Sequence, residues 1–266
     1  MNTIFKLVII AFVVVFISSC DDMSSSSRII NKIALKKINS IALMNFSIMR
    51  DCSISGGGDD VSYIKNGEIT QEWGKYHLFF LNEIIKTRKS PKFLDLNEMV
   101  KSDIYQNFKL ENTYIANRKE SLPVWLSPGV HFVNTFEGVG IVLINSTNSR
   151  KFCKSLNTDA VLSIQLTYGI IEGINFPIFG NFIKPKWKAF CKIKSELFNN
   201  VGELVWHYEC LVKSPLKISA NKSLNLILYS SSSINGKQTY ELIKSVQEYS
   251  SNKIISALYS DINEKK

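Results

Sequence analysis

The sequence predicts an α/β protein with a single mixed β-sheet covered by helices, a C-terminal antiparallel hairpin and a C-terminal helix. An apolar, β-branched run at 38–46 is typical of a buried central strand, and two alternating runs flank an Asn-Asn-Val-Gly turn. The C-terminal residues 238–261 repeat apolar side chains at helical spacing. A chain of 266 residues, 45% of them hydrophobic, can bury a core of one or at most two domains.

The overall composition excludes several classes of protein. The apolar content and the 11% of aromatic residues exclude disorder for most of the chain. Five cysteines are too few for a disulfide scaffold of this length, and a single long apolar run excludes a polytopic membrane protein. The net charge of +9 suits nucleic acid, an anionic membrane or an acidic partner without choosing among them.

The N-terminal residues have the pattern of a signal peptide. Lys6 precedes an unbroken apolar run at 7–17, which is shorter than the roughly 20 residues of a membrane-spanning helix. The run ends in Ile17-Ser18-Ser19-Cys20, which resembles the lipobox of bacterial lipoproteins. The resemblance implies that Cys20 carries the lipid anchor, including a fatty-acyl group such as palmitate, and becomes the first residue of the mature chain. The alternative is a plain secretory leader, or a short anchor helix, with a chance cysteine.

The lipobox also implies a location and a domain organisation. Two or three acyl chains on Cys20 give a stable attachment to the bilayer, so we expect a lipid-anchored protein at the periplasmic face of the cell membrane. The acidic Asp21 and Asp22 resemble the signal for retention in the inner membrane, which favours it over the outer one. We expect a signal peptide at 1–19, a lipidated cysteine and flexible tether at 20–32, and a single α/β domain at 33–266.

The first half of this domain predicts a strand at 38–46, a helix at 71–88 and a second helix at 94–108. Three glycines among aspartates at 51–60 predict a loop; phosphate binding lacks the Gly-Lys-Ser/Thr sequence, and calcium binding lacks the EF-hand spacing. The second half predicts a strand at 139–145, a helix at 147–156 and a strand at 160–171. This order is compatible with a parallel crossover. The hairpin strands at 187–198 and 203–212 follow, then a short strand at 224–229 and the C-terminal helix.

Two short segments carry a second resemblance. The segment from Ser155 to Leu162 and the strand from Ile41 to Phe46 are similar to parts of envelope lipoproteins of the CsgG, LpoB and TolB N-terminal type. The segment from Gly202 to Trp206 fits the same pattern. The resemblance covers 38–48, 139–212 and the C-terminal helix, and it implies the same kind of α/β domain. It implies no activity, because these families differ widely in what they do.

The sequence offers few candidates for catalysis, and we predict no catalytic residue, metal or cofactor. The chain has three histidines, and it lacks the H-E-x-x-H, C-x-x-C and G-x-S-x-G motifs. His77 and His207 lie in partly apolar segments, which favours structural roles for both. His131 lies in a Pro-Gly loop, where functional residues often occur, and is the candidate of an alternative hypothesis in which the protein is a membrane-anchored hydrolase.

The hairpin predicts a disulfide between Cys191 and Cys210. If the turn at 199–202 is symmetric, these two cysteines face each other directly across the strands, and Lys192 faces Glu209. Directly opposed residues are close enough for a disulfide, and an exported protein meets an oxidising compartment. Two buried free thiols are the alternative, and a bulged turn would change the register.

Two surface features predict contacts with partners. Lys188, Lys192 and Lys194 share the outward face of one strand; a solvated sheet face is favoured over a membrane contact, and export argues against nucleic acid. An apolar loop is a candidate partner or membrane contact through Ile174, Phe176, Ile178, Phe179 and Phe182. We therefore expect a non-enzymatic envelope lipoprotein that binds another envelope protein. It could also be a subunit of an oligomeric envelope assembly.

Overall fold

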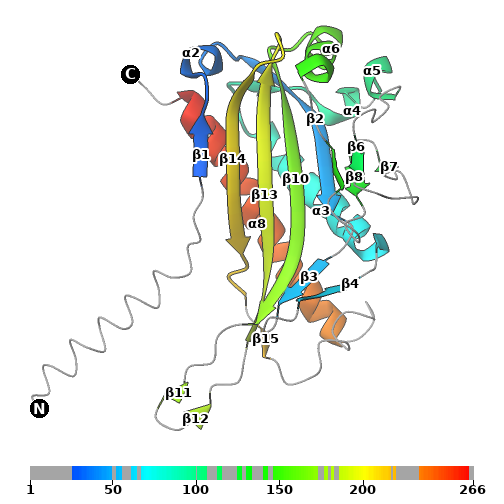
Figure 1. Ribbon diagram of the computed structural model, residues 1–266, viewed down its shortest axis with the longest axis vertical. Helices are drawn as coiled ribbons and strands as arrows, with labels where there is room; N and C mark the ends of the chain where they lie inside the picture. Colours follow the sequence, from blue (N-terminus) through cyan, green and yellow to red (C-terminus); the bar gives the residue numbers. More distant parts are fainter. Residues whose placement is uncertain are drawn as a thin grey trace, which may run out of the picture.

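The main sheet forms the body of the molecule (Figure 1). The computed structural model describes residues 26–49, 52–55, 61–64, 67–99, 101–106, 113–115, 125–127, 130–133, 140–142, 146–172, 177–178, 181–182, 186–216, 218–219 and 234–263. Within them, the sheet has the order β1-β14-β13-β10-β2-β8-β7, with β3, β4, β5 and β15 attached beside this path. The pairs β11–β12 and β6–β9 form two small separate sheets.

The strands on the main path are β1 (Ser26–Ile29), β2 (Ser40–Met49), β7 (Trp125–Ser127), β8 (Val130–Val133), β10 (Ala160–Glu172), β13 (Lys186–Asn199) and β14 (Leu204–Lys213). The other strands are β3 (Cys52–Ser55), β4 (Val61–Ile64), β5 (Lys92–Phe93), β6 (Thr113–Ile115), β9 (Gly140–Val142), β11 (Pro177–Ile178), β12 (Asn181–Phe182) and β15 (Ile218–Ser219). The helices are α2 (Lys32–Leu35), α3 (Gly67–Lys86), α4 (Leu96–Met99), α5 (Asp103–Gln106), α6 (Ser146–Leu156) and α8 (Ile234–Asn263).

The predicted fold class is confirmed. β2 runs parallel to β10, β8 and β5, whereas β10, β13, β14 and β1 pair antiparallel in succession, so the sheet is mixed. The hairpin of β13 and β14 is present, and α8 closes the described chain. Two further predicted elements are also confirmed with small changes of boundary: α6 and β10 occupy 146–156 and 160–172.

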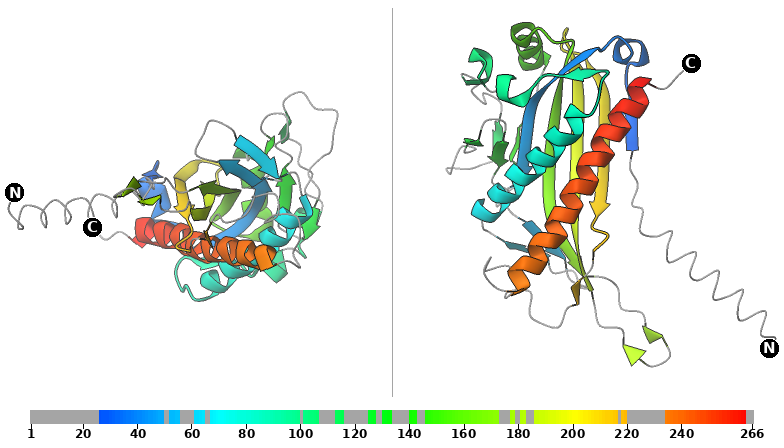
Figure 2. Two further views of the ribbon diagram at one scale, coloured as in Figure 1. Left: turned by 90° about the horizontal axis from the view of Figure 1, so that it is seen from below. Right: turned by 180° about the vertical axis from the view of Figure 1, so that it is seen from behind.

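Helices α3 and α8 cover one face of this sheet (Figure 2). The alternation of β13 and β14 explains why, since Cys191, Ile193 and Leu197 are buried while Lys192 between them is exposed. Trp206 of β14 is completely buried on the helix side, and its Nε1 donates a hydrogen bond of 2.7 Å to Oδ2 of Asp261 in α8. The core therefore lies between the sheet and these two helices.

A carboxylate joins the starts of the parallel strands β2 and β10. Oδ2 of Asp159 accepts hydrogen bonds from the backbone N–H groups of Asn39 and Ser40, at 2.9 and 3.0 Å. The hydroxyl of Ser40 in turn accepts the backbone N–H of Asp159 at 2.9 Å. These reciprocal bonds align the starts of the two strands at the turn between α6 and β10. The chain reverses in this turn at Asn157, which has a φ of 50°.

Two predicted elements differ from the structure, and a third lies outside the residues that it describes. The expected helix at 94–108 is two separate turns, α4 and α5. The expected strand at 139–145 is the short β9, which pairs with β6 instead of entering the main sheet, so residues 139–171 do not form the parallel crossover with which their order was compatible. The parallel neighbours of β10 are β2 and β3, both more than a hundred residues earlier, because a short strand can pair at any sequence distance. The strand expected at 224–229 lies outside the described residues.

The expected flexible tether at 20–32 is also wrong in its second half. Residues 26–29 form β1, an antiparallel edge strand on β14, and Asn31 caps the short helix α2 that follows. The backbone N–H of Ile30 continues the pairing by donating to the carbonyl of Val205 at 3.0 Å. Serine-rich sequence suggested a linker, but an edge strand is held by backbone hydrogen bonds that any side chain permits. The described fold therefore begins at Ser26 and not near Ile33.

The turn between β13 and β14 is tighter than expected. The backbone N–H of Asn199 donates to the carbonyl of Glu203 at 2.9 Å, which leaves a loop of residues 200–202. Gly202 has a φ of 83°, the left-handed conformation that ends three-residue hairpin loops. A second irregularity follows between Leu197 and Phe198, where Val205 becomes the extra residue of β14.

Candidate functional site

The residues predicted to meet the membrane or a partner lie mainly outside the described chain. Cys20 precedes the first described residue, and Ile174, Phe176 and Phe179 fall in gaps. Ile178 and Phe182 belong to the two-stranded pair of β11 and β12, which extends beyond the end of the main sheet where β10 ends (Figure 1). The predicted contacts of Cys20 and of these apolar residues therefore stay predictions. Among the helices that the structure describes, none is both long enough and apolar enough to cross a membrane.

The predicted register of the two cysteines is wrong. Cys191 faces Val212, and Cys210 faces Ile193, because the tight turn and the extra residue each move β14 by one position. Because these two shifts add up to two positions, both cysteines still lie on the helix side of the sheet. They are no longer opposite each other. Both cysteines are buried free thiols. The disulfide was predicted from a register that the structure does not have. Burial, and then the neighbouring Cys210, raise the pKa of the Cys191 thiol well above its usual value, which makes it a poor nucleophile.

The most buried polar cluster joins α3, β10 and α8 around His77, which is completely buried. Nδ1 of His77 lies 2.6 Å from the hydroxyl of Tyr168, and its Nε2 lies 3.1 Å from the hydroxyl of Ser250. Nε2 of Gln247 donates to the Tyr168 hydroxyl at 3.2 Å, and the Ser250 hydroxyl donates to the carbonyl of Gln247 at 3.0 Å. We refer to His77, Tyr168, Gln247 and Ser250 as the buried network.

The bonding order within the buried network assigns the proton of His77. The Tyr168 hydroxyl receives a hydrogen bond from Gln247, and it donates its own proton to Nδ1 of His77 when the neutral ring carries its hydrogen on Nε2. The Ser250 hydroxyl gives its proton to the Gln247 carbonyl, so it accepts the N–H of His77 Nε2. Each of these bonds is satisfied by neutral groups alone. Burial also lowers the pKa of His77 to about 3, which agrees with a neutral ring.

The buried network is a structural element, because a ring with no exposed surface cannot touch a substrate. This supports the structural role predicted for His77. The partners of His77 were missed by sequence reasoning, since Tyr168 and Ser250 lie 91 and 173 residues away along the chain. The sequence contains no local signal for such a contact.

The second candidate is the face of the sheet that α3 and α8 do not cover (Figures 1 and 2). Cross-strand partners share a face, so the register arranges the outward side chains of β1, β14 and β13 in rows, which we number from the turn at 199–203. The rows contain, in order, Arg28, His207 and Glu196; Glu209 and Lys194; Leu211 and Lys192; Lys213 and Phe190; and Lys188. We call this surface the open face. It includes the three lysines that the sequence predicted to share one face.

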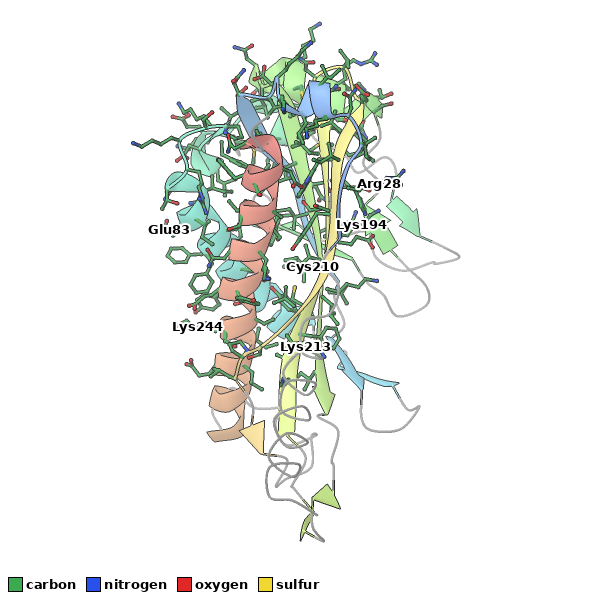
Figure 3. All side chains as sticks on the ribbon, turned by 90° about the vertical axis from the view of Figure 1, so that its left-hand side faces the viewer. Arg28, Glu83, Lys194, Cys210, Lys213 and Lys244 are labelled. Carbon is green, nitrogen blue, oxygen red and sulfur yellow. The ribbon has the colours of Figure 1, made fainter. Side chains whose placement is uncertain are left out.

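The charges of the open face change from one end to the other. In the first two rows, His207 places Nδ1 3.5 Å from Glu196 and Nε2 3.4 Å from Glu209, and Lys194 lies 3.0 Å from Glu196. Glu196 is therefore paired with Lys194 within the face, whereas the neutral ring of His207, which carries one N–H, can donate to only one of the two carboxylates. The next three rows contain the basic Lys192, Lys213 and Lys188 and no acidic residue. Figure 3 shows Arg28, Lys194 and Lys213 one below another along the strands, whereas Glu83 and Lys244 lie on the helices.

The outer surface of α3 carries two exposed aromatic residues, Tyr76 and Phe79, which we call the exposed aromatic pair. Phe79 is 58% exposed and Tyr76 is 39% exposed, and the ring of Phe79 meets Phe80 edge-on with centroids 5.8 Å apart. Exposed aromatic side chains of this kind are enriched where proteins contact one another. The helical spacing at 71–88 predicted this helix but not which of its aromatic residues face outward.

The remaining candidates bear on catalysis. His131 lies in β8 directly opposite Ser47 of β2, and its side chain lies outside the described part of the structure. In the described chain, no group of three or more His, Cys, Asp or Glu residues is arranged to hold a metal ion. The hydrolase hypothesis therefore stays untested.

Comparisons with known proteins give a distant likeness only. No protein-family model matches the chain, and no curated protein matches it. Among solved structures, the chain is similar to the PelC dodecamer from Paraburkholderia phytofirmans, with 8% identity and a TM-score of 0.26 over 85% of this chain and 97% of that one. A single-substitution variant of that dodecamer gives 10% identity and a TM-score of 0.23, over 85% and 96% of the two chains. At such TM-scores the likeness carries no argument about function.

Proposed function

We propose that this protein is a bacterial envelope lipoprotein, anchored through acylated Cys20, whose folded domain binds another envelope protein. The observation that carries the proposal is the position of β1. The strand that follows the lipobox is the edge of the main sheet, and only residues 21–25 separate it from Cys20. An extended chain spans at most about 3.5 Å per residue, so Ser26 lies within about 20 Å of the anchor. A lipid on Cys20 would thus hold the whole domain against the bilayer surface.

Replacement of Cys20 with alanine is expected to abolish acylation and to release the protein from the membrane, or to leave it unprocessed. The physical reason is that the thioether and its acyl chains supply most of the membrane affinity of such a protein. Metabolic labelling with an alkyne fatty acid, followed by separation of membrane and soluble fractions, measures both effects. Cys210→Ala is the matched control, because it removes a buried thiol that lies outside the lipobox. Equal labelling of wild type and Cys20→Ala would contradict the anchor.

The exposed aromatic pair of α3 supports the protein-binding half of the proposal. A photo-crosslinking amino acid in place of Phe79 is expected to yield a discrete cross-linked species in living cells, identified by mass spectrometry as another envelope protein. The control position is Val201, which is 60% exposed at the tip of the hairpin and so is equally accessible. The same products from both positions, or none from Phe79, would contradict a partner at α3.

A further inference from the structure

We infer that the end of the sheet at which β13 turns into β14 docks onto the anionic headgroups of the bilayer that holds the anchor. This docking rests on the proposed anchoring through Cys20 and deepens it, because it selects the surface of the folded domain that faces the membrane. We call this surface the turn end, and it comprises residues 30–37, 88–92, 146–159 and 200–203. Three observations support it: the joining of these segments, their positive charge and the exposed aliphatic side chains among them.

Hydrogen bonds join the segments of the turn end into one surface. Nδ2 of Asn31 donates to Oε1 of Glu203 at 2.7 Å, which ties α2 to the hairpin loop. The guanidinium of Arg150 in α6 donates to the carbonyl of Val201 at 3.0 and 3.3 Å, which ties α6 to the same loop. Residues 88–92 reach this end because β5 pairs with the first residues of β2, beside the turn between α6 and β10. Figure 1 shows α2, α6 and the β13–β14 turn together at one end of the molecule.

The turn end carries most of the positive charge of the chain. Its four segments have a formal charge of +7, against +9 for the whole sequence, and adding residues 95–106 of the adjacent α4 and α5 still leaves +5. Its two carboxylates, those of Asp159 and Glu203, accept hydrogen bonds from neutral backbone or side-chain amides. The basic side chains are all exposed: Lys32, Lys36, Lys37, Arg88, Lys89, Lys92, Arg150, Lys151 and Lys154. Such a surface attracts an anionic partner.

Exposed aliphatic side chains among these charges favour a bilayer as the anionic partner. Ile33 in α2 is 73% exposed, Val201 in the hairpin loop is 60% exposed, and Ile30 beside α2 is 46% exposed. A surface that binds at a membrane interface combines basic residues, which attract the anionic headgroups, with apolar residues, which enter the boundary between headgroups and acyl chains. An acidic protein would satisfy the charges but would leave the aliphatic side chains without an apolar partner.

The length of the link to Cys20 allows the anchor and the turn end to contact one bilayer. β1 runs toward the turn end, and the chain advances about 13 Å from Ser26 to Ile30. The six steps from Cys20 to Ser26 span at most about 20 Å. Because this span exceeds the length of β1, Cys20 can lie level with the turn end. Basic residues held within about 8–10 Å of an anionic leaflet are attracted to it.

The test uses an acyl-free chain that begins at Asp21, so that binding depends on the protein surface alone. Flotation with vesicles of phosphatidylcholine containing about 30% phosphatidylglycerol is compared with flotation on pure phosphatidylcholine. We expect binding to the anionic vesicles only, and weaker binding as salt rises. The triple variant Lys36→Gln, Lys37→Gln and Lys151→Gln should bind about a hundredfold more weakly, since each basic residue near the surface contributes roughly a factor of five. Ile33→Gln should bind about tenfold more weakly, because it removes an apolar side chain from the contact.

Matched variants keep this test specific. Lys192→Gln, Lys213→Gln and Lys244→Gln remove the same charge away from the turn end, and Figure 3 shows Lys213 and Lys244 well below α2. Leu216→Gln replaces an aliphatic residue that is 46% exposed near β15. Both controls should retain wild-type binding, and circular dichroism checks that all four variants fold.

Three results would overturn the docking of the turn end. Equal losses in the two triple variants would show that the attraction follows net charge alone. Wild-type binding by Ile33→Gln would show that no aliphatic side chain enters the bilayer. Absence of binding to anionic vesicles would favour an acidic protein as the partner of the turn end. Acylation of Cys20 has its own labelling test, so the proposed anchor would survive each of these results.

Discussion

Replacing Gly202 with alanine is expected to lower the free energy of unfolding by about 2–4 kcal/mol, the range typical of a steric and conformational conflict at a packed site. Gly202 has a φ of 83°, which costs a residue with a Cβ about 1–2 kcal/mol. A Cβ at this position would also lie 2.3 Å from the carbonyl oxygen of Ser146, the first residue of α6. Because the obstacle is backbone, relief requires the hairpin to move away from α6.

Two control variants separate the causes of this loss. Val201→Ala changes the neighbouring exposed residue and should shift stability by no more than about 0.5 kcal/mol. Gly202→Asn tolerates a positive φ but still brings a Cβ against Ser146. Chemical denaturation followed by circular dichroism measures all three variants. If Gly202→Asn were as stable as wild type, the contact with α6 would be looser than the structure shows.

The turn at Gly202 illustrates what the sequence could and could not predict. Alternation of polar with apolar residues identified both strands of the hairpin and the outward face of Lys192. Asn199-Asn200-Val201-Gly202 identified a turn, but the same residues suit either a symmetric or a bulged closure. The choice depends on a side chain, since Oδ1 of Asn199 accepts the backbone N–H groups of Val201 and Glu203 at 3.2 and 2.8 Å. That bond forms only in the folded turn, and so the register and the position of Cys210 were missed.

The candidate sites also differ in how much of each could be predicted from the sequence. Local periodicity predicts which residues face outward, so the lysines of the open face could be recognised from the sequence alone. Charged residues recur at alternate positions in β13 and β14, and this signal could also have identified Glu196, His207 and Glu209. Edge strand β1 could not be recognised, because its serines carry no periodicity. The buried network is harder still, since it needs the packing of α3 against α8.

Acid is expected to destabilise the protein through His77. The unfolded chain protonates this side chain below its ordinary pKa of 6.5, whereas burial keeps the folded ring neutral down to a pKa of about 3. Between these values the unfolded state binds more protons, so unfolding becomes more favourable as the pH falls. The contribution is absent above pH 6.5 and approaches about 1.4 kcal/mol for each pH unit below it.

The variant His77→Leu isolates this contribution. It should be less stable than wild type at pH 7, because the hydroxyls of Tyr168 and Ser250 each lose a partner and buried polar groups without partners cost about 1–3 kcal/mol. Its stability should nevertheless fall less steeply between pH 6.5 and 4, so the difference between the two proteins narrows with acid. Urea denaturation at half-unit pH intervals measures both slopes.

A second histidine variant provides the control. His207→Gln changes a partly exposed ring on the open face and leaves the buried network intact, so the steep dependence due to His77 should persist in it. Parallel curves for wild type and His77→Leu would show that the ring is protonated in the folded protein. The observed bonding order opposes this, because a protonated Nδ1 would donate to the Tyr168 hydroxyl and could no longer accept the proton of that hydroxyl. The dependence of the free energy of unfolding on pH therefore measures how strongly the packing of α3, β10 and α8 keeps the His77 ring neutral.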